Sequence, residues 1–240
     1  MNIALLGYGK MGKEVERVAL SRGHNVVLII DTDGDWYEKR SQLSNLKIDV
    51  AIDFSTPKSA VRNISKCFEL NLPVVVGTTG WLDELEYIKQ TCIDGDHGLF
   101  YSSNFSLGVN LFFELNRILA KLMKAHTEYV PQIEEIHHTQ KLDSPSGTAI
   151  SLANDLVRNL NNKVAWVNQE DAKFDEIPIV SKRIDDVTGI HSITYTSSDD
   201  VIEIKHSAFS RTGFALGAVL AAEFIKGKVG IFGMKDMLGV

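Results

Sequence analysis

The chain has 240 residues, of which 44% are hydrophobic and 23% charged, so it can bury a sizeable core in one large domain or two modest ones. A net charge of −6 argues against a general nucleic-acid-binding protein, because such proteins carry a basic face. No apolar run approaches the ~18–20 residues that a membrane span needs. Without a signal peptide or a CxxC pair, we expect a cytoplasmic protein with reduced thiols.

Apolar strands alternate with helices along the first hundred residues. Continuous apolar strands in such an alternation indicate a parallel sheet that helices cover on both faces, which is a Rossmann-type, doubly wound α/β fold. The pattern predicts strands over 2–6, 26–31, 50–57, 73–80 and 98–104, with helices over 10–22, 59–70 and 82–92.

The pattern changes after residue 104. Three later segments alternate apolar with polar residues, which is typical of a sheet with one face open to solvent. We therefore expect a smaller α+β domain with a mixed or antiparallel open sheet, beginning near 104–108. The pattern predicts helices over 108–124, 146–160 and 214–228, strands over 130–138, 177–184, 190–197 and 200–209, and a hairpin turn at 198–200.

A GxGxxG sequence, Gly7 to Gly12, follows the first strand and opens the next helix. Its first glycine permits the tight turn, the second lets the backbone approach a pyrophosphate, and the third lets the helix pack closely on the strand. Asp31 ends the next strand, where an acid that binds a ribose hydroxyl belongs. This context favours a dinucleotide site over a glycine turn that serves packing alone.

Two polar turns follow strands at the same predicted edge of the sheet. Gly77-Thr78-Thr79-Gly80 follows the fourth strand, and the run from Tyr101 to Asn104 ends the fifth. Ligands of such sheets bind outside the carboxyl ends of the strands. Each turn could be an ordinary loop, but together they lie where a nicotinamide would rest.

The segment HHTQKLDSPSGT, residues 137–148, gathers two histidines and a lysine. Histidine titrates nearest neutrality and so suits proton transfer. Neighbouring side chains of a strand point to opposite faces, so His137 and His138 reach one cleft only if the strand ends there. Lys141 could donate a proton or bind a carboxylate. The alternative is two surface histidines and a solvated lysine.

The same segment ends in Ser146-Gly147-Thr148, which opens a helix. The free N–H groups at a helix start attract an anion. A cation cluster beside such a start, in an acidic protein, favours an acid–base site next to an anion site. No HExxH or Cys/His spacing indicates a metal, and we expect none.

These motifs resemble those of the dihydrodipicolinate reductase family, also called the 4-hydroxy-tetrahydrodipicolinate reductases. The resemblance implies hydride transfer from NADH or NADPH to a cyclic dicarboxylate imine. The product would be tetrahydrodipicolinate, in diaminopimelate and lysine biosynthesis. The resemblance also implies a cytoplasmic homotetramer without nucleic-acid or membrane partners. It rests on GYGKMG at 7–12, DFSTP at 53–57, GTTG at 77–80, SNFSLGVN at 103–110, EIHHTQKLDSPSGTA at 135–149, SRTGFALGAV at 210–219 and MKDMLG at 234–239.

The resemblance also implies roles for individual residues. Residues 1–106, completed by 213–240, would bind the dinucleotide, and 107–212 would bind the substrate and form the oligomer. His137 and Lys141 would be catalytic, with the choice of proton donor left open. Substrate binding falls to His138, Ser146, Gly147 and Thr148. Cofactor binding falls to Gly7, Tyr8, Gly9, Lys10, Met11, Gly12, Asp31, Gly77, Thr78, Thr79, Tyr101, Ser102, Ser103, Asn104 and Phe105, the last packing beside the nicotinamide.

The residues after Asp31 bear on the choice of nicotinamide. A carboxylate at this position accepts hydrogen bonds from a free ribose hydroxyl and repels a 2′-phosphate. The next residues, 32–35, add negative charge and no arginine, although Lys39 or Arg40 could fold back to a phosphate. We expect NADH to be used at least as well as NADPH.

Two other kinds of protein fit parts of the pattern. A semialdehyde dehydrogenase would need a nucleophilic cysteine, but Cys67 lies mid-helix in an apolar setting and Cys92 ends a helix. A regulator that senses NADH would need a basic helix-turn-helix arm, and we find no such segment. Both alternatives are therefore weaker than the reductase.

Overall fold

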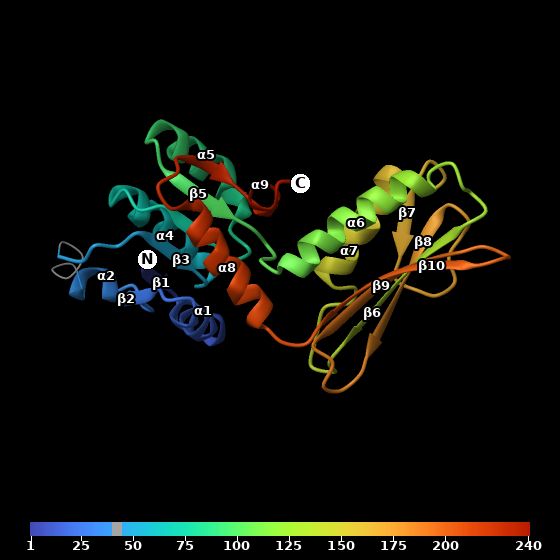
Figure 1. Cartoon of the computed structure of the whole chain (residues 1–240), viewed down its shortest axis with the longest axis horizontal. Helices are drawn as coiled ribbons and strands as arrows, with labels where there is room; N and C mark the ends of the chain where they lie inside the picture. Colours follow the sequence, from blue (N-terminus) through green and yellow to red (C-terminus); the bar gives the residue numbers. More distant parts are fainter. Residues whose placement is uncertain (40–44) are drawn as a thin grey trace. The chain divides into compact units, whose positions relative to one another are not determined.

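A computed structural model of the chain describes residues 1–39 and 45–240. These residues divide into two compact units, one formed by residues 1–107 with 212–240 and the other by residues 108–211 (Figure 1). The two units are described separately below.

In the described part of the first unit, six strands form one sheet in the order β11-β5-β4-β3-β1-β2. Every neighbouring pair runs parallel, as a Rossmann-type fold requires. The predicted doubly wound sheet is thus confirmed. The strands are β1 (Asn2–Leu6), β2 (Asn25–Ile30), β3 (Val50–Asp53), β4 (Val74–Val76), β5 (Gly98–Tyr101) and β11 (Gly230–Phe232).

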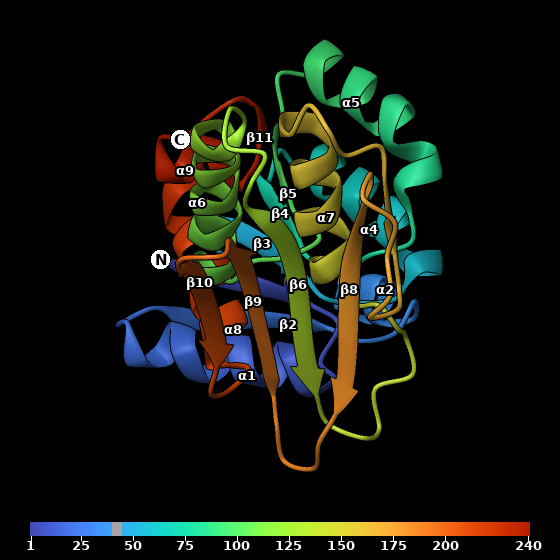
Figure 2. The same ribbon diagram turned by 90° about the vertical axis from the view of Figure 1, so that its right-hand side faces the viewer.

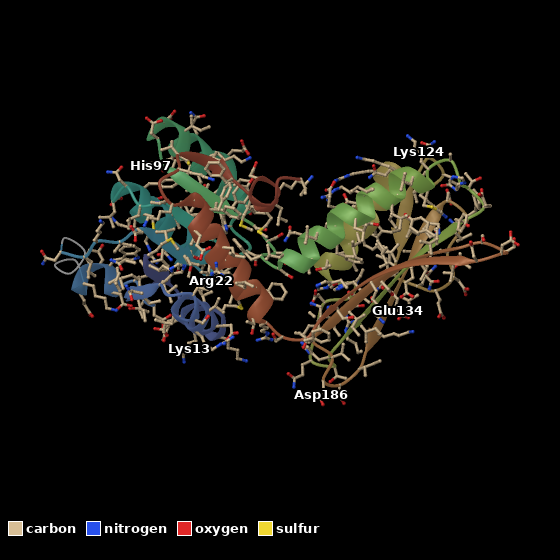
Figure 3. The ribbon with its side chains drawn as sticks, in the orientation of Figure 1. Lys13, Arg22, His97, Lys124, Glu134 and Asp186 are labelled. Atoms are coloured by element: carbon tan, nitrogen blue, oxygen red, sulfur yellow. The ribbon has the colours of Figure 1, made fainter. Side chains whose placement is uncertain are left out.

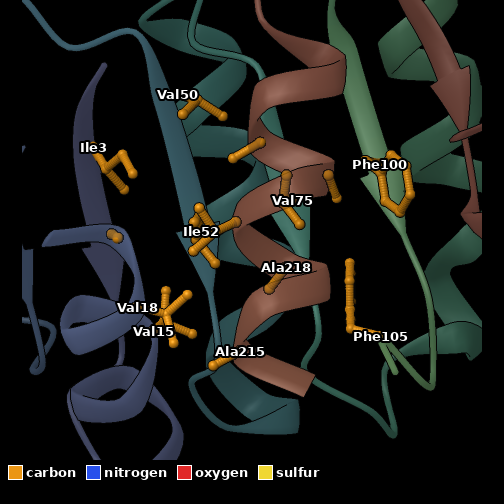
Figure 4. Close-up of a cluster of buried hydrophobic side chains, with 14 of the residues drawn as sticks. Ile3, Val15, Val18, Val50, Ile52, Val75, Phe100, Phe105, Ala215 and Ala218 are labelled. Carbon is orange, nitrogen blue, oxygen red and sulfur yellow. The ribbon is translucent and has the colours of Figure 1, made fainter. Parts of the chain in front are cut away.

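Helices cover both faces of this sheet because its strands are apolar on both sides. Ile3 and Leu5 of β1 join one core cluster, while Ala4 and Leu6 join another. Figure 4 shows the first cluster, which helices α1 and α8 close. The second cluster lies under α4 and α5. The helices are α1 (Lys10–Ser21), α2 (Asp35–Glu38), α4 (Pro57–Glu69), the 3-10 turn η1 (Leu82–Glu84), α5 (Leu85–Asp94), α8 (Thr212–Ile225) and α9 (Met234–Leu238).

The second unit holds a mixed sheet in the order β10-β9-β6-β8-β7. The central strand β6 pairs antiparallel with β9 and parallel with β8, so the mixed form of the prediction is confirmed. Figure 2 looks onto this sheet. Its elements are α6 (Leu107–Met123), β6 (Val130–His137), α7 (Gly147–Asn159), β7 (Ala165–Val167), β8 (Glu176–Arg183), β9 (Gly189–Thr196) and β10 (Val201–Ala208).

Helices α6 and α7 cover one face of the second sheet (Figure 1). Ile133 of β6 packs against them, and so do Ile179 of β8 and Tyr195 of β9. Buried and half-buried residues alternate along β6, as expected for a sheet with one covered face. This alternation places Glu135 and His137 on the covered face, where Ile133 also lies.

The structure corrects several predicted boundaries. The strand predicted over 50–57 ends at Asp53, because Pro57 starts helix α4 rather than ending a strand. The strand predicted over 98–104 ends at Tyr101, before a turn. Strands β7 and β11 and helix α2 were not predicted, because segments of three or four residues are too short to show a period.

Candidate functional site

The glycine turn between β1 and α1 is packed too tightly for other residues. Gly7 has a φ of +86°, and a Cβ there would lie 2.4 Å from the Phe54 carbonyl oxygen. A Cβ on Gly12 would lie 2.3 Å from the Gly7 carbonyl oxygen. Helix α1 has no side-chain cap at Gly9, so its first N–H groups can bind an anion. The predicted pyrophosphate cradle therefore has the backbone geometry that it needs.

A pocket of about 220 Å³ opens beside this turn. Asp31 lies in it and is exposed, but Asp31 Oδ1 also accepts a hydrogen bond of 2.6 Å from the Tyr8 N–H. Asp31, which was predicted to bind the ribose, thus also stabilises the glycine turn. The lining comes from the ends of β1, β2 and β3 and the start of α4: Gly7, Tyr8, Gly9, Ile30, Asp31, Thr32, Asp33, Phe54, Ser55, Thr56, Ser59 and Asn63.

Two cations near this pocket, Lys39 and Arg62, are already paired with carboxylates. Lys39 Nζ lies 2.7 Å from Asp35 Oδ1 and donates a bond of 2.7 Å to the Ile29 carbonyl oxygen. Arg62 of α4 donates to Asp33, with Nη1 and Oδ2 2.6 Å apart. Sequence reasoning missed Arg62 because it lies on a different helix, far from Asp31 in the chain. Arg40, the other predicted candidate, lies outside the described residues.

A buried carboxylate ties together the loops that follow β3 and β4. Asp53 is fully buried and accepts hydrogen bonds from the Thr78 hydroxyl, from Asn63 Nδ2 at 2.8 Å and from the Ser55 N–H at 3.1 Å. Burial raises the pKa of Asp53, against the opposing effect of these bonds. The Thr78 hydroxyl is therefore engaged by Asp53, and it also accepts a bond of 2.8 Å from the N–H of Ser55, which lines the pocket. Sequence reasoning missed this network.

The remaining residues expected at the cofactor divide between surface and core. Phe105 is only 2% exposed, and its ring packs against Phe54 and Phe100 in the core. Phe105 fills the core beneath α8, and packing of its ring beside a nicotinamide stays a prediction. Exposed or half-buried positions are taken by Tyr8, Gly9, Lys10, Met11, Gly77, Thr79, Tyr101, Ser102, Ser103 and Asn104.

In the second unit, His137 ends β6 and faces the covered side of the sheet. It is 7% exposed, and its ring packs edge-on against His191 at 5.0 Å between centroids. Its Nδ1 lies 3.5 Å from Glu135 Oε2. Burial lowers the pKa of His137 to about 4, and the neighbouring His191 adds to this effect. The imidazole is therefore neutral at pH 7.

Lys141 lies in the loop after β6 and forms an ion pair. Its Nζ is 2.8 Å from Asp143 Oδ1, and this contact lowers the pKa of Asp143. The guanidinium of Arg183 holds the loop by donating 2.6 Å to the Asp143 carbonyl oxygen. His138 is half-buried, and its Nδ1 has no hydrogen-bond partner among the residues that the structure describes. A pocket of about 290 Å³ opens beside His138 and the loop at 185–188.

Helix α7 starts as predicted, but Ser146 has a different role. Ser146 is buried; its hydroxyl caps the helix by accepting from the Ala149 N–H at 3.2 Å and also lies 3.1 Å from His191 Nε2. The Ser146 hydroxyl is therefore engaged within the protein, and substrate binding by Ser146 stays a prediction. Gly147 is exposed and Thr148 half-buried, so their N–H groups form the open part of the helix start.

Three ligand-type side chains meet here: the metal-binding atoms of Glu135, His137 and His191 lie within 4.8 Å of one another. Sequence reasoning missed the cluster because His191 lies on β9. A metal ion could use this spacing, but Glu135 already accepts bonds from the Ser146 N–H at 3.1 Å and from Ser181 Oγ at 2.8 Å. The carboxylate is thus satisfied by the protein, and we interpret Glu135, Ser146, Ser181 and His191 as a hydrogen-bonded network. His137 Nδ1 lies beside this network and has no hydrogen-bond partner among the described residues.

Both cysteines are buried, and burial raises the pKa of each thiol, that of Cys92 to about 11. A thiolate nucleophile is thus disfavoured at either position. Across residues 1–39 and 45–240, none of the helices has the length and apolar character that crossing a membrane requires.

Comparison with known families and sequences gives one consistent result. Residues 1–105 match the family model "Dihydrodipicolinate reductase, N-terminus", and residues 108–238 match "Dihydrodipicolinate reductase, C-terminus". A 4-hydroxy-tetrahydrodipicolinate reductase of Christiangramia forsetii is 53% identical over 99% of this chain and 98% of its own length. The corresponding protein of Thermosipho africanus is 35% identical, with the same coverage.

Solved structures show the same fold. A dipicolinate-bound dihydrodipicolinate reductase from Paenisporosarcina sp. TG-14 superposes with a TM-score of 0.77 and 24% identity, over 98% of both chains. A probable dehydrogenase from Thermotoga maritima reaches a TM-score of 0.55 at 12% identity, covering 99% of this chain and 92% of its own. At these identities the likeness concerns the fold alone.

Proposed function

This chain belongs to the dihydrodipicolinate reductase family, and from that membership we propose that it reduces 4-hydroxy-tetrahydrodipicolinate to tetrahydrodipicolinate with NADH or NADPH in lysine biosynthesis. One structural observation supports this proposal above the others. Lys141, which is ion-paired with Asp143, lies one short loop before a helix start whose exposed N–H groups suit a carboxylate.

The first unit has what a dinucleotide needs. The pyrophosphate would lie against the glycine turn and the uncapped start of α1, and Asp31 would accept a ribose hydroxyl. The Asp53 network keeps the loops after β3 and β4 together, so the pocket wall beside Ser55 is fixed before a ligand arrives. When bound, the nicotinamide supplies the hydride.

The second unit has what a dianionic substrate needs. The N–H groups of Gly147 and Thr148 would bind one carboxylate at the start of α7. His138, in the loop after β6, would also bind the substrate. The 4-hydroxyl group leaves the substrate as water, which makes the ring a conjugated imine, and addition of hydride to that imine leaves negative charge on the ring. Lys141 would neutralise that charge by donating a proton from Nζ, which leaves the lysine as a neutral amine.

Of the two candidate proton donors, we propose Lys141. Its ammonium is paired with Asp143 and half-exposed, whereas His137 is buried and its pKa of about 4 leaves little imidazolium at neutral pH. His137 would instead remain neutral and shape the pocket wall beside Lys141.

We propose that the Thr148 hydroxyl donates to the same carboxylate as the N–H groups. Thr148→Val removes this hydroxyl and should raise KM for the substrate by about 10- to 100-fold, because a charge-assisted hydrogen bond contributes roughly 1.5–3 kcal/mol. Pyridine-2,6-dicarboxylate should inhibit the unchanged enzyme competitively, and less well in this variant. Steady-state kinetics with varied substrate measures both effects. Ser151→Ala is the control, because it removes a hydroxyl one turn later that bonds only the Gly147 carbonyl oxygen. No inhibition at millimolar diacid would argue against the site.

For the cofactor we propose that NADH is used at least as well as NADPH. The pocket presents Asp31 and Asp33, and the nearby cations Lys39 and Arg62 are held by carboxylates. The measurement is kcat/KM for both cofactors in the unchanged enzyme, in Asp31→Ala and in Arg62→Ala. Asp31→Ala should lower kcat/KM for NADH more than kcat/KM for NADPH. A strong preference for NADPH that Arg62→Ala abolishes would show that Arg62 leaves Asp33 for the phosphate.

We also propose that the enzyme is a cytoplasmic homotetramer. Gln132, Glu134 and Ile136 lie on the face of β6 away from the helices and are half-buried, so the second sheet offers a face on which another copy could pack. Light scattering would test this through the molar mass, which should equal four chains. A monomeric mass at micromolar concentration would contradict it.

A further inference from the structure

Glu135, in the second unit, has no solvent exposure, and the proposed reaction has so far assigned it no role. Charged side chains are seldom fully buried unless the protein pairs them. The oxygens of Glu135 accept two bonds of 3.1 Å from the Ser146 N–H and one of 2.8 Å from Ser181 Oγ. Burial alone would raise the pKa of Glu135, but the hydrogen bonds from His191, Ser146 and Ser181 lower it, so the group is ionised.

Glu135 also lies beside the histidine at the end of its own strand. Residues two apart in a strand share a face, which brings Glu135 Oε2 to 3.5 Å from His137 Nδ1. This is a charge contact and not a hydrogen bond, since His137 Nδ1 has no hydrogen-bond partner among the residues that the structure describes. The opposite edge of the ring faces Gly189, where a Cβ would lie 3.2 Å from His137 Nε2. A carboxylate next to one ring nitrogen favours the tautomer that carries its proton there. The contact therefore favours the proton on Nδ1.

Glu135 also contacts Arg183, which in turn binds the loop that carries Lys141. Arg183 Nη2 lies 3.5 Å from Glu135 Oε1, and the same guanidinium donates to the backbone carbonyls of Asp143 at 2.6 Å and Lys141 at 3.4 Å. Removal of the Glu135 charge would leave Arg183 without its buried partner. The loop that presents Lys141 would then lose part of its support.

We propose that Glu135 is a positioning residue for the reduction: its carboxylate fixes the tautomer and orientation of His137 and, through Arg183, the loop that carries Lys141. The inference rests on the proposed function, since it assigns Glu135 a part in that reaction. A purely structural role predicts only a loss of stability, so the two can be separated by kinetics and by the state of the His137 ring.

The charged and titratable groups around His137 come from every strand packed against it. Glu135 lies on β6, His191 on β9 and Arg183 on β8, with Lys141 in the following loop. His206 of β10 pairs in register with His191. Glu135 raises the pKa of His137, whereas His191, Lys141 and Arg183 lower it. Loss of the Glu135 charge should therefore lower this pKa further.

The kinetic test compares Glu135→Gln with Glu134→Gln. Glu134 is the neighbouring carboxylate of β6, half-buried on the face away from the helices and paired with Lys182 (Figure 3). Glu135→Gln should lower kcat at least ~10-fold, as loss of a buried carboxylate that orients a histidine does elsewhere, with NADH affinity unchanged. The kcat of Glu134→Gln should stay within about twofold of that of the unchanged enzyme. Unchanged kcat in Glu135→Gln, even with a lower Tm, would overturn the proposal.

Nitrogen NMR of 15N-histidine-labelled protein gives a readout independent of activity, with His137→Asn used to assign the signal. The unchanged protein should show a neutral ring with its proton on Nδ1, and Glu135→Gln should shift that proton toward Nε2. If the variant does not fold, the unchanged protein still decides, since a proton on Nε2 would overturn the proposal. An enzyme that is inactive on the proposed substrate would contradict the proposed function. The NMR measurement would still test whether Glu135 fixes the tautomer of His137.

Discussion

Replacement of Lys141 with alanine is expected to lower kcat by ~10²–10⁴-fold, the range for loss of a general acid. Lys141 is partly exposed and paired with Asp143, and the nearby His137 is neutral at pH 7. Without Lys141, the ring that has received hydride must take its proton from water. The effect should fall on kcat, because the residues proposed to bind the dinucleotide belong to the other unit.

Single-turnover oxidation of NADH at saturating substrate measures this step directly. Fluorescence titration with NADH should give the same dissociation constant for the variant as for the unchanged enzyme. Lys173→Ala is a suitable control, because that side chain is 81% exposed in a loop before β8. Near-normal turnover by Lys141→Ala would contradict its role, and if His137→Gln were also fully active, the acid–base assignment of the whole segment would fail.

Replacement of Gly7 with alanine is expected to weaken NADH binding by at least ~10-fold, which corresponds to about 1.4 kcal/mol. Two effects add at this position. The φ of +86° costs a residue with a Cβ roughly 1–2 kcal/mol, and the Cβ would lie 2.4 Å from the Phe54 carbonyl oxygen. The turn must shift to relieve this clash, and the first N–H groups of α1 would shift with it.

Gly23→Ala provides the matched control for this change. Gly23 has a similar φ of +78°, but a Cβ there meets nothing within 4 Å. Both variants should lose thermal stability through backbone strain, whereas only Gly7→Ala should lose affinity for NADH. Equal NADH affinity in the two variants, measured by calorimetry, would show that the turn does not hold the cofactor.

The sequence was sufficient for the architecture of both units, because long apolar strands and periodic helices carry strong signals. It also located the glycine turn, Asp31 and the helix start at Gly147, since each depends on residues that are close together in the chain. The short elements α2 and β7 escaped prediction, because a segment of three or four residues shows no period.

Contacts between distant segments were beyond the reach of sequence reasoning. Arg62 meets Asp33, and His191 meets Glu135, only after the strands and helices have packed. Glu135 was visible in the sequence, but its burial depends on which face of β6 the helices cover. Ser146 illustrates the same limit, since a helix cap and a ligand-binding hydroxyl have the same local sequence and only burial distinguishes them.

The most direct test of the central claim is an assay of the purified enzyme with freshly generated 4-hydroxy-tetrahydrodipicolinate and NADH. We predict NADH oxidation that depends on the substrate and yields an equal amount of tetrahydrodipicolinate, with NADPH no better as the reductant. A folded protein that binds NADH but oxidises neither cofactor above the rate without enzyme would contradict the proposed function.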